Sequence, residues 1–167
     1  LNDKAGKMSK SKGEFLTVSL LKSKGYDPKV YRLFCLQSHY RKPLEFSFDA
    51  LDNARAAYEK LVKRIGGLGK EGEADREKAE LYRQKFQAAL CDDLNSSMAL
   101  TVLYDMLKEE MSDATKYALA EDFDKVLSLD LTTAYAAMEA EAGGGVDAAM
   151  ESYILEKIEE RKAAKKE

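Results

Sequence analysis

Residues 47–65 read SFDALDNARAAYEKLVKRI, and this stretch decides the fold class. Ser47 is a preferred residue at a helix start, because its hydroxyl can accept a hydrogen bond from a backbone N–H of the first turn. Apolar residues then recur at spacings of three and four, the pattern of a helix with one buried face. They are Leu51, Ala54, Tyr58, Leu61 and Ile65. The stretch predicts a long amphipathic helix that needs other helices to cover it.

The sequence on both sides predicts more helices. Thr17 and Asp27 are suited to cap two short helices that run to about Lys24 and Ser38, with Gly25 ending the first in a left-handed conformation. Three later stretches carry apolar faces at helical spacing. These faces are Ala79, Tyr82, Phe86, Ala89 and Leu90; Met98, Val102, Leu103, Met106 and Leu107; and, after a cap at Asp113, Tyr117, Ala120, Phe123 and Leu127.

Strand patterns are almost absent, apart from a short extended piece at 14–16. We therefore expect an all-α fold, an antiparallel helical bundle preceded by a flexible loop and short helices. Three parts are expected: 1–46 with the loop and connecting helices, 47–130 with the bundle, and 131–167 with a linker and a C-terminal helix. A helix at 132–142 and another at 148–165 are expected on either side of a triple glycine.

Charge and cysteine content narrow the class of protein. Residues 1–65 contain 14 Lys and Arg against 7 Asp and Glu, whereas residues 66–167 contain 13 against 23. The basic first part suits contact with phosphates, and the acidic remainder argues against general coating of nucleic acid. Cys35 and Cys91 are expected to be buried free thiols. With one histidine and no C-x-x-C pattern, no metal site is expected within the chain.

The stretch Lys7-Met8-Ser9-Lys10-Ser11 lies between Gly6 and Gly13. Two lysines and two hydroxyl side chains on a glycine-flanked loop can close over phosphates and bind them with ammonium, hydroxyl and backbone N–H donors. A solvated, polar chain terminus is the structural alternative. The order of these residues favours a phosphate-binding loop.

KMSKS is the signature of class I aminoacyl-tRNA synthetases, and residues 7–50 resemble the cysteinyl-tRNA synthetase family. The resemblance returns at 92–95, which read DDLN, and at 158–164, which read IEERKAA. It implies a piece that begins near the signature loop and continues through the helical, tRNA-binding domain. Both ends are expected to be truncated, with the nucleotide-binding catalytic domain and its zinc ligands outside the chain.

The resemblance also implies a function and roles for the loop residues. In this family ATP, bound with Mg, activates cysteine, which is then transferred to the tRNA for cysteine. Lys10 is the first candidate for stabilising the transition-state phosphate charge and Lys7 the second. Met8, Ser9 and Ser11 would complete the ATP-binding loop. The 167-residue piece alone is expected to be inactive, because cysteine and ATP would bind mainly through the absent domain.

His39, Tyr40, Arg41 and Lys42 follow the second predicted helix and precede Pro43. The resemblance implies that they lie near bound tRNA, where Arg41 and Lys42 could meet phosphates. The structural alternative is that His39 and Tyr40 fasten the end of one helix to the next. The run 92–95 is expected to consist of helix caps rather than of catalytic carboxylates.

The sequence leaves two other functions open and also indicates where the protein works. A related cysteine ligase that acts on an amino-sugar pseudodisaccharide, and a non-catalytic helical interaction module, are the alternatives to a tRNA ligase. No apolar run approaches the length of a membrane span. We expect a cytoplasmic, monomeric protein that does not bind membranes.

Overall fold

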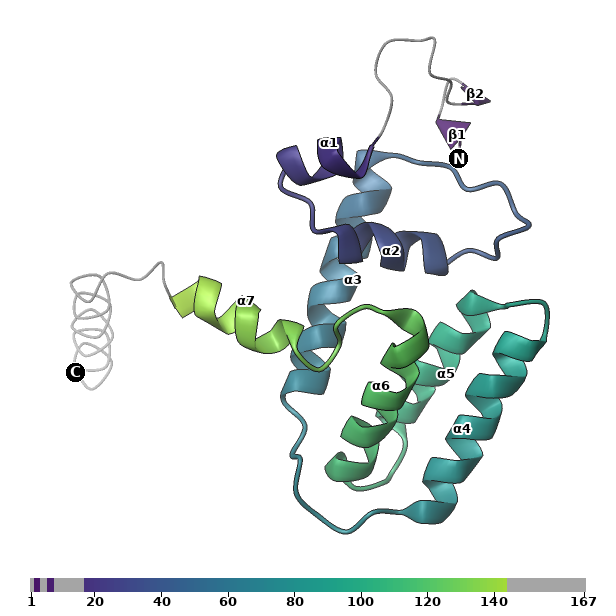
Figure 1. The fold of residues 1–167 in the computed structure, drawn as a ribbon, viewed down its shortest axis with the longest axis vertical. Helices are drawn as coiled ribbons and strands as arrows, with labels where there is room; N and C mark the ends of the chain where they lie inside the picture. Colours follow the sequence, from purple (N-terminus) through teal and green to yellow (C-terminus); the bar gives the residue numbers. More distant parts are fainter. Residues whose placement is uncertain (1, 4–5, 8–16, 144–167) are drawn as a thin grey trace, which may run out of the picture. The chain divides into compact units, whose positions relative to one another are not determined.

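The computed structural model describes residues 2–3, 6–7 and 17–143 (Figure 1). Strands β1 (Asn2–Asp3) and β2 (Gly6–Lys7) form a two-residue antiparallel pair, with Asn2 opposite Lys7. The expected extended piece at 14–16 and the expected helix at 148–165 lie outside the described residues.

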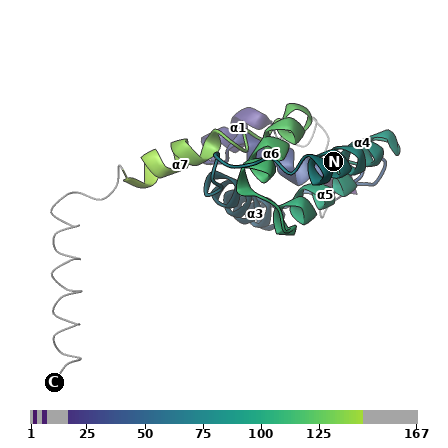
Figure 2. The same cartoon turned by 90° about the horizontal axis from the view of Figure 1, so that it is seen from below.

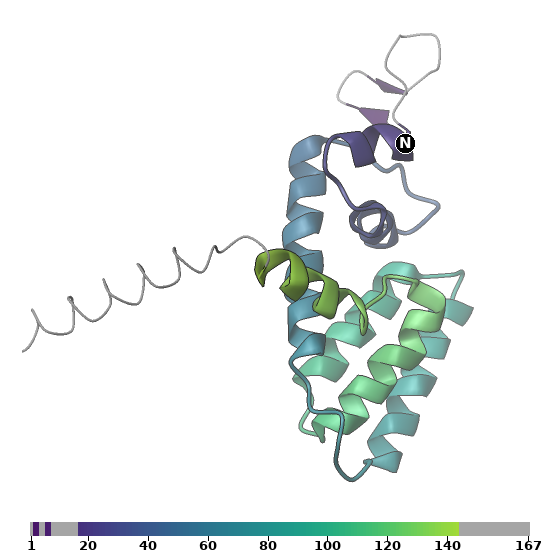
Figure 3. The same cartoon turned by 60° about the vertical axis from the view of Figure 1, so that its left-hand side comes forward.

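The expected all-α fold is confirmed. Within the described residues the helices are α1 (Val18–Ser23), α2 (Pro28–Leu36), α3 (Phe48–Gly66), α4 (Arg76–Cys91), α5 (Ser96–Lys108), α6 (Asp113–Leu127) and α7 (Ala134–Gly143). Helices α4, α5 and α6 pack against one another, α2 packs against both α3 and α5, and α3 also contacts α6 (Figures 1 and 3). Seen from below, α5 and α6 both lie beside α4 (Figure 2).

Local capping sets where the first three helices begin. Side-chain oxygens of Thr17, Asp27 and Ser47 accept backbone hydrogen bonds of 3.1, 2.7 and 3.1 Å in the first turns of α1, α2 and α3. Gly25 has φ of 79°, a left-handed conformation that glycine adopts without a steric penalty. All three predicted caps and this predicted helix end are confirmed. In α6, however, the cap is Ser112 and not the predicted Asp113.

The predicted apolar stripe of α3 is the centre of the core. Its five members are 0–5% exposed. Across the bundle, the rings of Phe86 in α4 and Phe123 in α6 stack with centroids 4.0 Å apart and an interplanar angle of 3°. Face-to-face packing of this kind buries two large side chains in the narrow space between the helices.

Several predicted core positions are wrong. Met98 is 49% exposed, because the buried stripe of α5 passes through Ala99 and Leu100 instead. Leu90, Val102 and Tyr117 lie at the edges of their stripes and are only half-buried. Neither cysteine is buried: Cys35 is half-buried and Cys91, the last residue of α4, is exposed. Both are free thiols.

The segment after α6 is held against α2 and α3. The Asp124 carboxylate accepts hydrogen bonds from the backbone N–H groups of Leu129, at 2.7 Å, and Leu131, at 3.0 Å. Arg32 of α2 donates to the Leu127 carbonyl at the end of α6. As a result, Leu129 and Leu131 are completely buried although they lie outside any helix.

Helix α7 belongs to a second compact unit that starts at Thr133. It confirms the helix expected at 132–142, with bounds shifted by one or two residues. In the part of the chain that the structure describes, no helix is both long enough and apolar enough to cross a membrane.

Candidate nucleic-acid interface

A polar cluster forms where the segment after α2 meets the turn between α4 and α5. The backbone N–H of Asp92 donates to the Ala88 carbonyl at 3.0 Å and ends α4. The side chain of Asn95 accepts from the Met98 N–H at 3.1 Å and starts α5. At the centre of this turn, the side chain of Asp93 points to the segment that carries residues 39–42.

Asp93 is the hub of the cluster. Its carboxylate accepts from Arg41 through Nε at 2.5 Å and through Nη2 at 2.9 Å. It also accepts from the Tyr40 hydroxyl at 2.7 Å, and His39 Nε2 lies 3.7 Å away. The two contacts with the guanidinium form a bidentate pair, which fixes its orientation as well as its position.

Backbone geometry presents Asp93 to these partners. Asp93 and Leu94 both have φ of 52°, the left-handed region that non-glycine residues rarely adopt. Two consecutive residues of this kind cost about 1–3 kcal/mol each, so surrounding contacts must hold them. One such contact is the hydroxyl of Ser96, which donates to the Leu36 carbonyl at the end of α2 at 3.0 Å.

Three planar groups stack next to the ion pair. The rings of His39 and Tyr40 have centroids 5.0 Å apart and are tilted by 23°. The Arg41 guanidinium carbon lies 5.2 Å from the centroid of Tyr40. Although it is stacked, Tyr40 remains 59% exposed, and the side chains of Arg41 and Lys42 are exposed as well. The cluster therefore presents cationic and aromatic groups to solvent.

The hydrogen bonds shift the ionisation of the cluster in a consistent direction. The bond from Arg41, and then that from Tyr40, lowers the pKa of the Asp93 carboxyl. The bond to Asp93 raises the pKa of the Tyr40 phenol. Near neutral pH Asp93 is thus a carboxylate and Tyr40 a neutral donor. Asp93 offsets the charge of Arg41, whereas Lys42 adds an exposed charge beside the pair.

The predicted site residues are described only in part. Met8, Ser9, Lys10 and Ser11 lie outside the described residues, and Lys7 is placed only by its backbone in β2. Residues 39–42 do lie together. His39 and Tyr40 contact Asp93 in the next part of the bundle, as the structural alternative supposes, and Arg41 does so too. Tyr40 and Arg41 nevertheless stay exposed, whereas His39 is half-buried.

Asp93 is the residue that sequence reasoning missed. The run 92–95 was expected to consist of caps, which is right for Asp92 and Asn95 and wrong for Asp93. Its role depends on Arg41, 52 positions away in the chain. The available signal was an acidic side chain in a tight interhelical turn within a bundle that also carries the basic segment 39–42.

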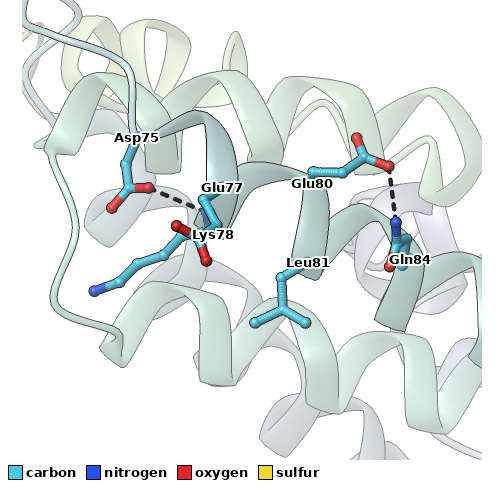
Figure 4. A pocket seen from close by; sticks show the side chains of 6 residues that line it. All are labelled: Asp75, Glu77, Lys78, Glu80, Leu81 and Gln84. Atoms are coloured by element: carbon cyan, nitrogen blue, oxygen red, sulfur yellow. Dashed lines mark hydrogen bonds between the residues drawn. The ribbon is translucent and has the colours of Figure 1, made fainter.

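A concave surface lies along α4 but offers no chemistry comparable to that of the polar cluster. This open groove of 610 Å³ is lined by Asp75, Glu77, Lys78, Glu80, Leu81 and Gln84. Two pairs of its polar residues bind each other: Asp75 accepts from the Lys78 N–H at 3.1 Å, and Gln84 donates to Glu80 at 3.1 Å (Figure 4). The Lys78 ammonium binds Glu109 and the Glu110 carbonyl, which lie outside the groove lining. Among the described residues, no three His, Cys, Asp or Glu side chains are placed to hold a metal ion.

Comparisons with known proteins match two parts of the chain. Residues 1–56 match the family model for the catalytic domain of class I (C) tRNA synthetases, and residues 85–128 match the DALR domain. Arg41 lies in the first match and Asp93 in the second, so their ion pair joins the two.

Similar proteins are cysteine–tRNA ligases. That of Novosphingobium aromaticivorans is 40% identical over 136 residues, which cover 78% of this chain and 28% of the relative. Those of Methylococcus capsulatus and Burkholderia lata are 37% and 38% identical, over 94% and 75% of this chain and 36% and 26% of the relatives. The chain thus spans about a quarter to a third of these relatives. The expected resemblance to the cysteinyl-tRNA synthetase family is confirmed.

Proposed function

We propose that this chain is a region of a cysteine–tRNA ligase, an enzyme that activates cysteine with ATP and transfers it to the tRNA for cysteine. One observation carries the proposal: the synthetase catalytic-domain match and the DALR match occur in this order in one chain, with the KMSKS sequence inside the first. The relatives in which similar sequence occurs are named as ligases of this kind.

The loop 7–11 would act on ATP, bound as its magnesium complex. When the cysteine carboxylate attacks the α-phosphate, the bond to the β-phosphate breaks and pyrophosphate leaves, and negative charge grows on the phosphate oxygens in the transition state. A positioned ammonium stabilises this charge more in the transition state than in the ground state. We assign this role to Lys10 and a supporting one to Lys7, with Met8, Ser9 and Ser11 shaping the loop. The family resemblance puts the zinc ligands outside this chain.

The helical region would contact tRNA, and residues 39–42 are our candidates for the contact. The exposed Arg41 and Lys42 can neutralise backbone phosphates, and the exposed ring of Tyr40 can lie against sugar or base. Phosphate contacts position a nucleic acid without reading its sequence. This suits a surface that orients tRNA while other parts of the enzyme recognise it.

We also propose how the chain is divided into parts, its oligomeric state and its cellular location. We assign 1–46 to the loop and its connecting helices, 47–130 to the tRNA-contacting bundle, and 131–167 to a linker and C-terminal helix. The first family match ends at residue 56, inside α3, so the catalytic region would share this helix with the bundle. We also propose a monomeric, cytoplasmic enzyme.

The full-length protein that contains these 167 residues tests the function. Purified protein should catalyse cysteine-dependent exchange between ATP and pyrophosphate, with serine in place of cysteine as the control. It should then attach radiolabelled cysteine to a transcript of the tRNA for cysteine. Exchange without transfer to tRNA, or no exchange at all in protein that is folded and supplied with zinc and magnesium, would overturn the proposal.

A further inference from the structure

The hydrogen bonds of Arg41 leave part of its side chain uncommitted to Asp93. A guanidinium group carries five N–H donors in one plane. Asp93 takes the Nε donor and one on Nη2, so it binds the group from the side. Three donors are not used by this pair, and two of these lie side by side on the Nη1 and Nη2 edge. The side chain is 66% exposed, so these donors can be reached by a ligand.

The same contacts fix the direction in which that edge faces. Tyr40 lies under the guanidinium and donates to the same carboxylate, so the plane and the rotation of the group are both set. Asp93 in turn is held by a left-handed turn and by the hydrogen bond from Ser96 to Leu36. A long side chain that is already ordered loses less entropy when it binds a ligand.

We propose that Asp93 is a positioning residue for tRNA binding, which holds Arg41 side-on so that its Nη1 and Nη2 edge receives a tRNA phosphate. This inference rests on the proposed function, because it supposes that tRNA is the ligand. A phosphate offers two oxygens at a spacing that matches the paired donors of that edge. Arg41 then bridges a carboxylate of the protein and a phosphate of the RNA.

The effect of removing Asp93 on tRNA affinity tests the proposal, because charge alone predicts a change of the opposite sign. A carboxylate beside the binding edge repels phosphate, so its removal should strengthen tRNA binding if Asp93 had no positioning role. If Asp93 orients Arg41, its removal frees the guanidinium and weakens binding. The two effects have opposite signs in one measurement.

The experiment compares Asp93→Asn with Asp92→Asn in the full-length protein. Each substitution removes one negative charge from the same turn. Asp92 is exposed and ends α4 through its backbone, so its variant reports the charge effect alone. Affinity for the tRNA for cysteine is measured over a range of salt concentrations, and thermal unfolding is measured on each protein.

We expect Asp92→Asn to bind tRNA as well as the unmodified protein or slightly better. Asp93→Asn should bind about fivefold more weakly or worse, with a salt slope smaller by about one as one phosphate contact is lost. Arg41→Lys keeps the positive charge and removes the paired N–H donors of the planar guanidinium. It should weaken tRNA binding to a similar degree. In the Asp93→Asn background, Arg41→Lys should add little, because both act on one contact.

A milder variant distinguishes weaker tRNA binding from a loss of folding. Tyr40→Phe keeps both charges and the aromatic stack and removes only one hydrogen bond to Asp93, so it should weaken binding in the same direction but less. If Asp93→Asn binds as tightly as Asp92→Asn or tighter, the positioning role is wrong while the proposed function stands. If the unmodified protein does not bind tRNA, the proposed function itself fails.

Discussion

The Tyr58 hydroxyl in the middle of α3 donates a hydrogen bond of 2.8 Å to the Leu129 carbonyl, in the segment that follows α6. Both residues are buried, with exposures of 5% and 0%. Burial raises the pKa of the Tyr58 phenol, so the hydroxyl keeps its proton and remains a donor. This contact joins residues 71 positions apart and supplies a partner to a carbonyl that water does not reach.

Removal of this hydroxyl should destabilise the fold. Tyr58→Phe leaves the Leu129 carbonyl without its donor, which should lower the free energy of unfolding by about 1–3 kcal/mol. Urea unfolding of the 167-residue chain measures the change. The matched control is Tyr26→Phe, whose hydroxyl makes an exposed bond of 2.7 Å to Asp52 and which should lose much less. Equal losses in the two variants would contradict the importance of burial here.

The ion pair of Asp93 should give a defined pH dependence of stability. Its pKa is lowered in the folded state, so the stabilisation is present above the unfolded-state pKa of about 3.9 and is lost as pH falls through the folded-state pKa. The difference in unfolding free energy between the unmodified chain and Asp93→Asn should be constant above about pH 5 and shrink at lower pH. A difference that grows on acidification would refute this assignment.

Lys10 of the signature loop should accelerate adenylate formation from cysteine and ATP. In the full-length protein, Lys10→Ala should lower the rate of cysteine-dependent pyrophosphate exchange by about two orders of magnitude or more, since one transition-state donor is lost. Cysteine affinity should change little, because the lysine faces phosphate. Lys12→Ala, two positions further on, serves as the control. A Lys10 variant whose main defect is weaker cysteine binding would exclude the assigned role.

The basic pair after α2 should matter for tRNA and not for adenylate formation. Replacement of Arg41 and Lys42 by Glu should weaken tRNA binding and reduce the salt slope by about one to two. Because Arg41→Glu puts a carboxylate against Asp93, the pair Arg41→Gln and Lys42→Gln is the cleaner form. Lys60→Gln with Lys85→Gln, in α3 and α4, controls for general loss of charge. Unchanged affinity and slope would place the tRNA surface elsewhere.

The 167-residue chain alone should show background pyrophosphate exchange. It spans about a quarter to a third of the ligases that it resembles, and the loop 7–11 can supply only one wall of an ATP site. The assay uses purified chain with cysteine, ATP and magnesium, and the full-length protein is the positive control. Robust exchange by the short chain would mean that its own residues build the catalytic site.

Features set by neighbouring residues could be predicted from the sequence. Thr17, Asp27 and Ser47 cap helices because the donors that they bind lie two or three residues away. The stripe of α3 was predictable because the helix is long and its apolar spacing regular. The stripe of α5 was right at Leu103, Met106 and Leu107 and wrong at its start. Met98 is as apolar as its neighbours, and only packing against α4 and α6 decides that Ala99 and Leu100 are buried there instead.

Contacts between distant segments could not be predicted. No local pattern pairs Arg41 with Asp93, because the pair depends on how α2 meets the turn between α4 and α5 and on an unusual left-handed backbone. The burial of Leu129 and Leu131 was missed for a similar reason. The segment 128–131 has no helical or strand period. Burial of its leucines depends on the hydrogen bonds that Asp124 accepts from the N–H groups of Leu129 and Leu131, and on the bond that Tyr58 donates to the Leu129 carbonyl.

The two hydrogen bonds that Asp124 accepts restrict how the chain can change in length. Its carboxylate spans five and seven positions forward, so an inserted residue between 125 and 131 would break one bond or expose a buried leucine. The connection at 67–75 carries mostly exposed residues, and its backbone is held towards its end, where Ser112 donates to the Glu73 carbonyl at 2.8 Å and the Asp75 N–H donates to the Thr115 hydroxyl at 2.9 Å. Natural variants of this bundle should therefore gain and lose residues at 69–72, before these two hydrogen bonds, while the spacing from α6 to Leu131 stays constant.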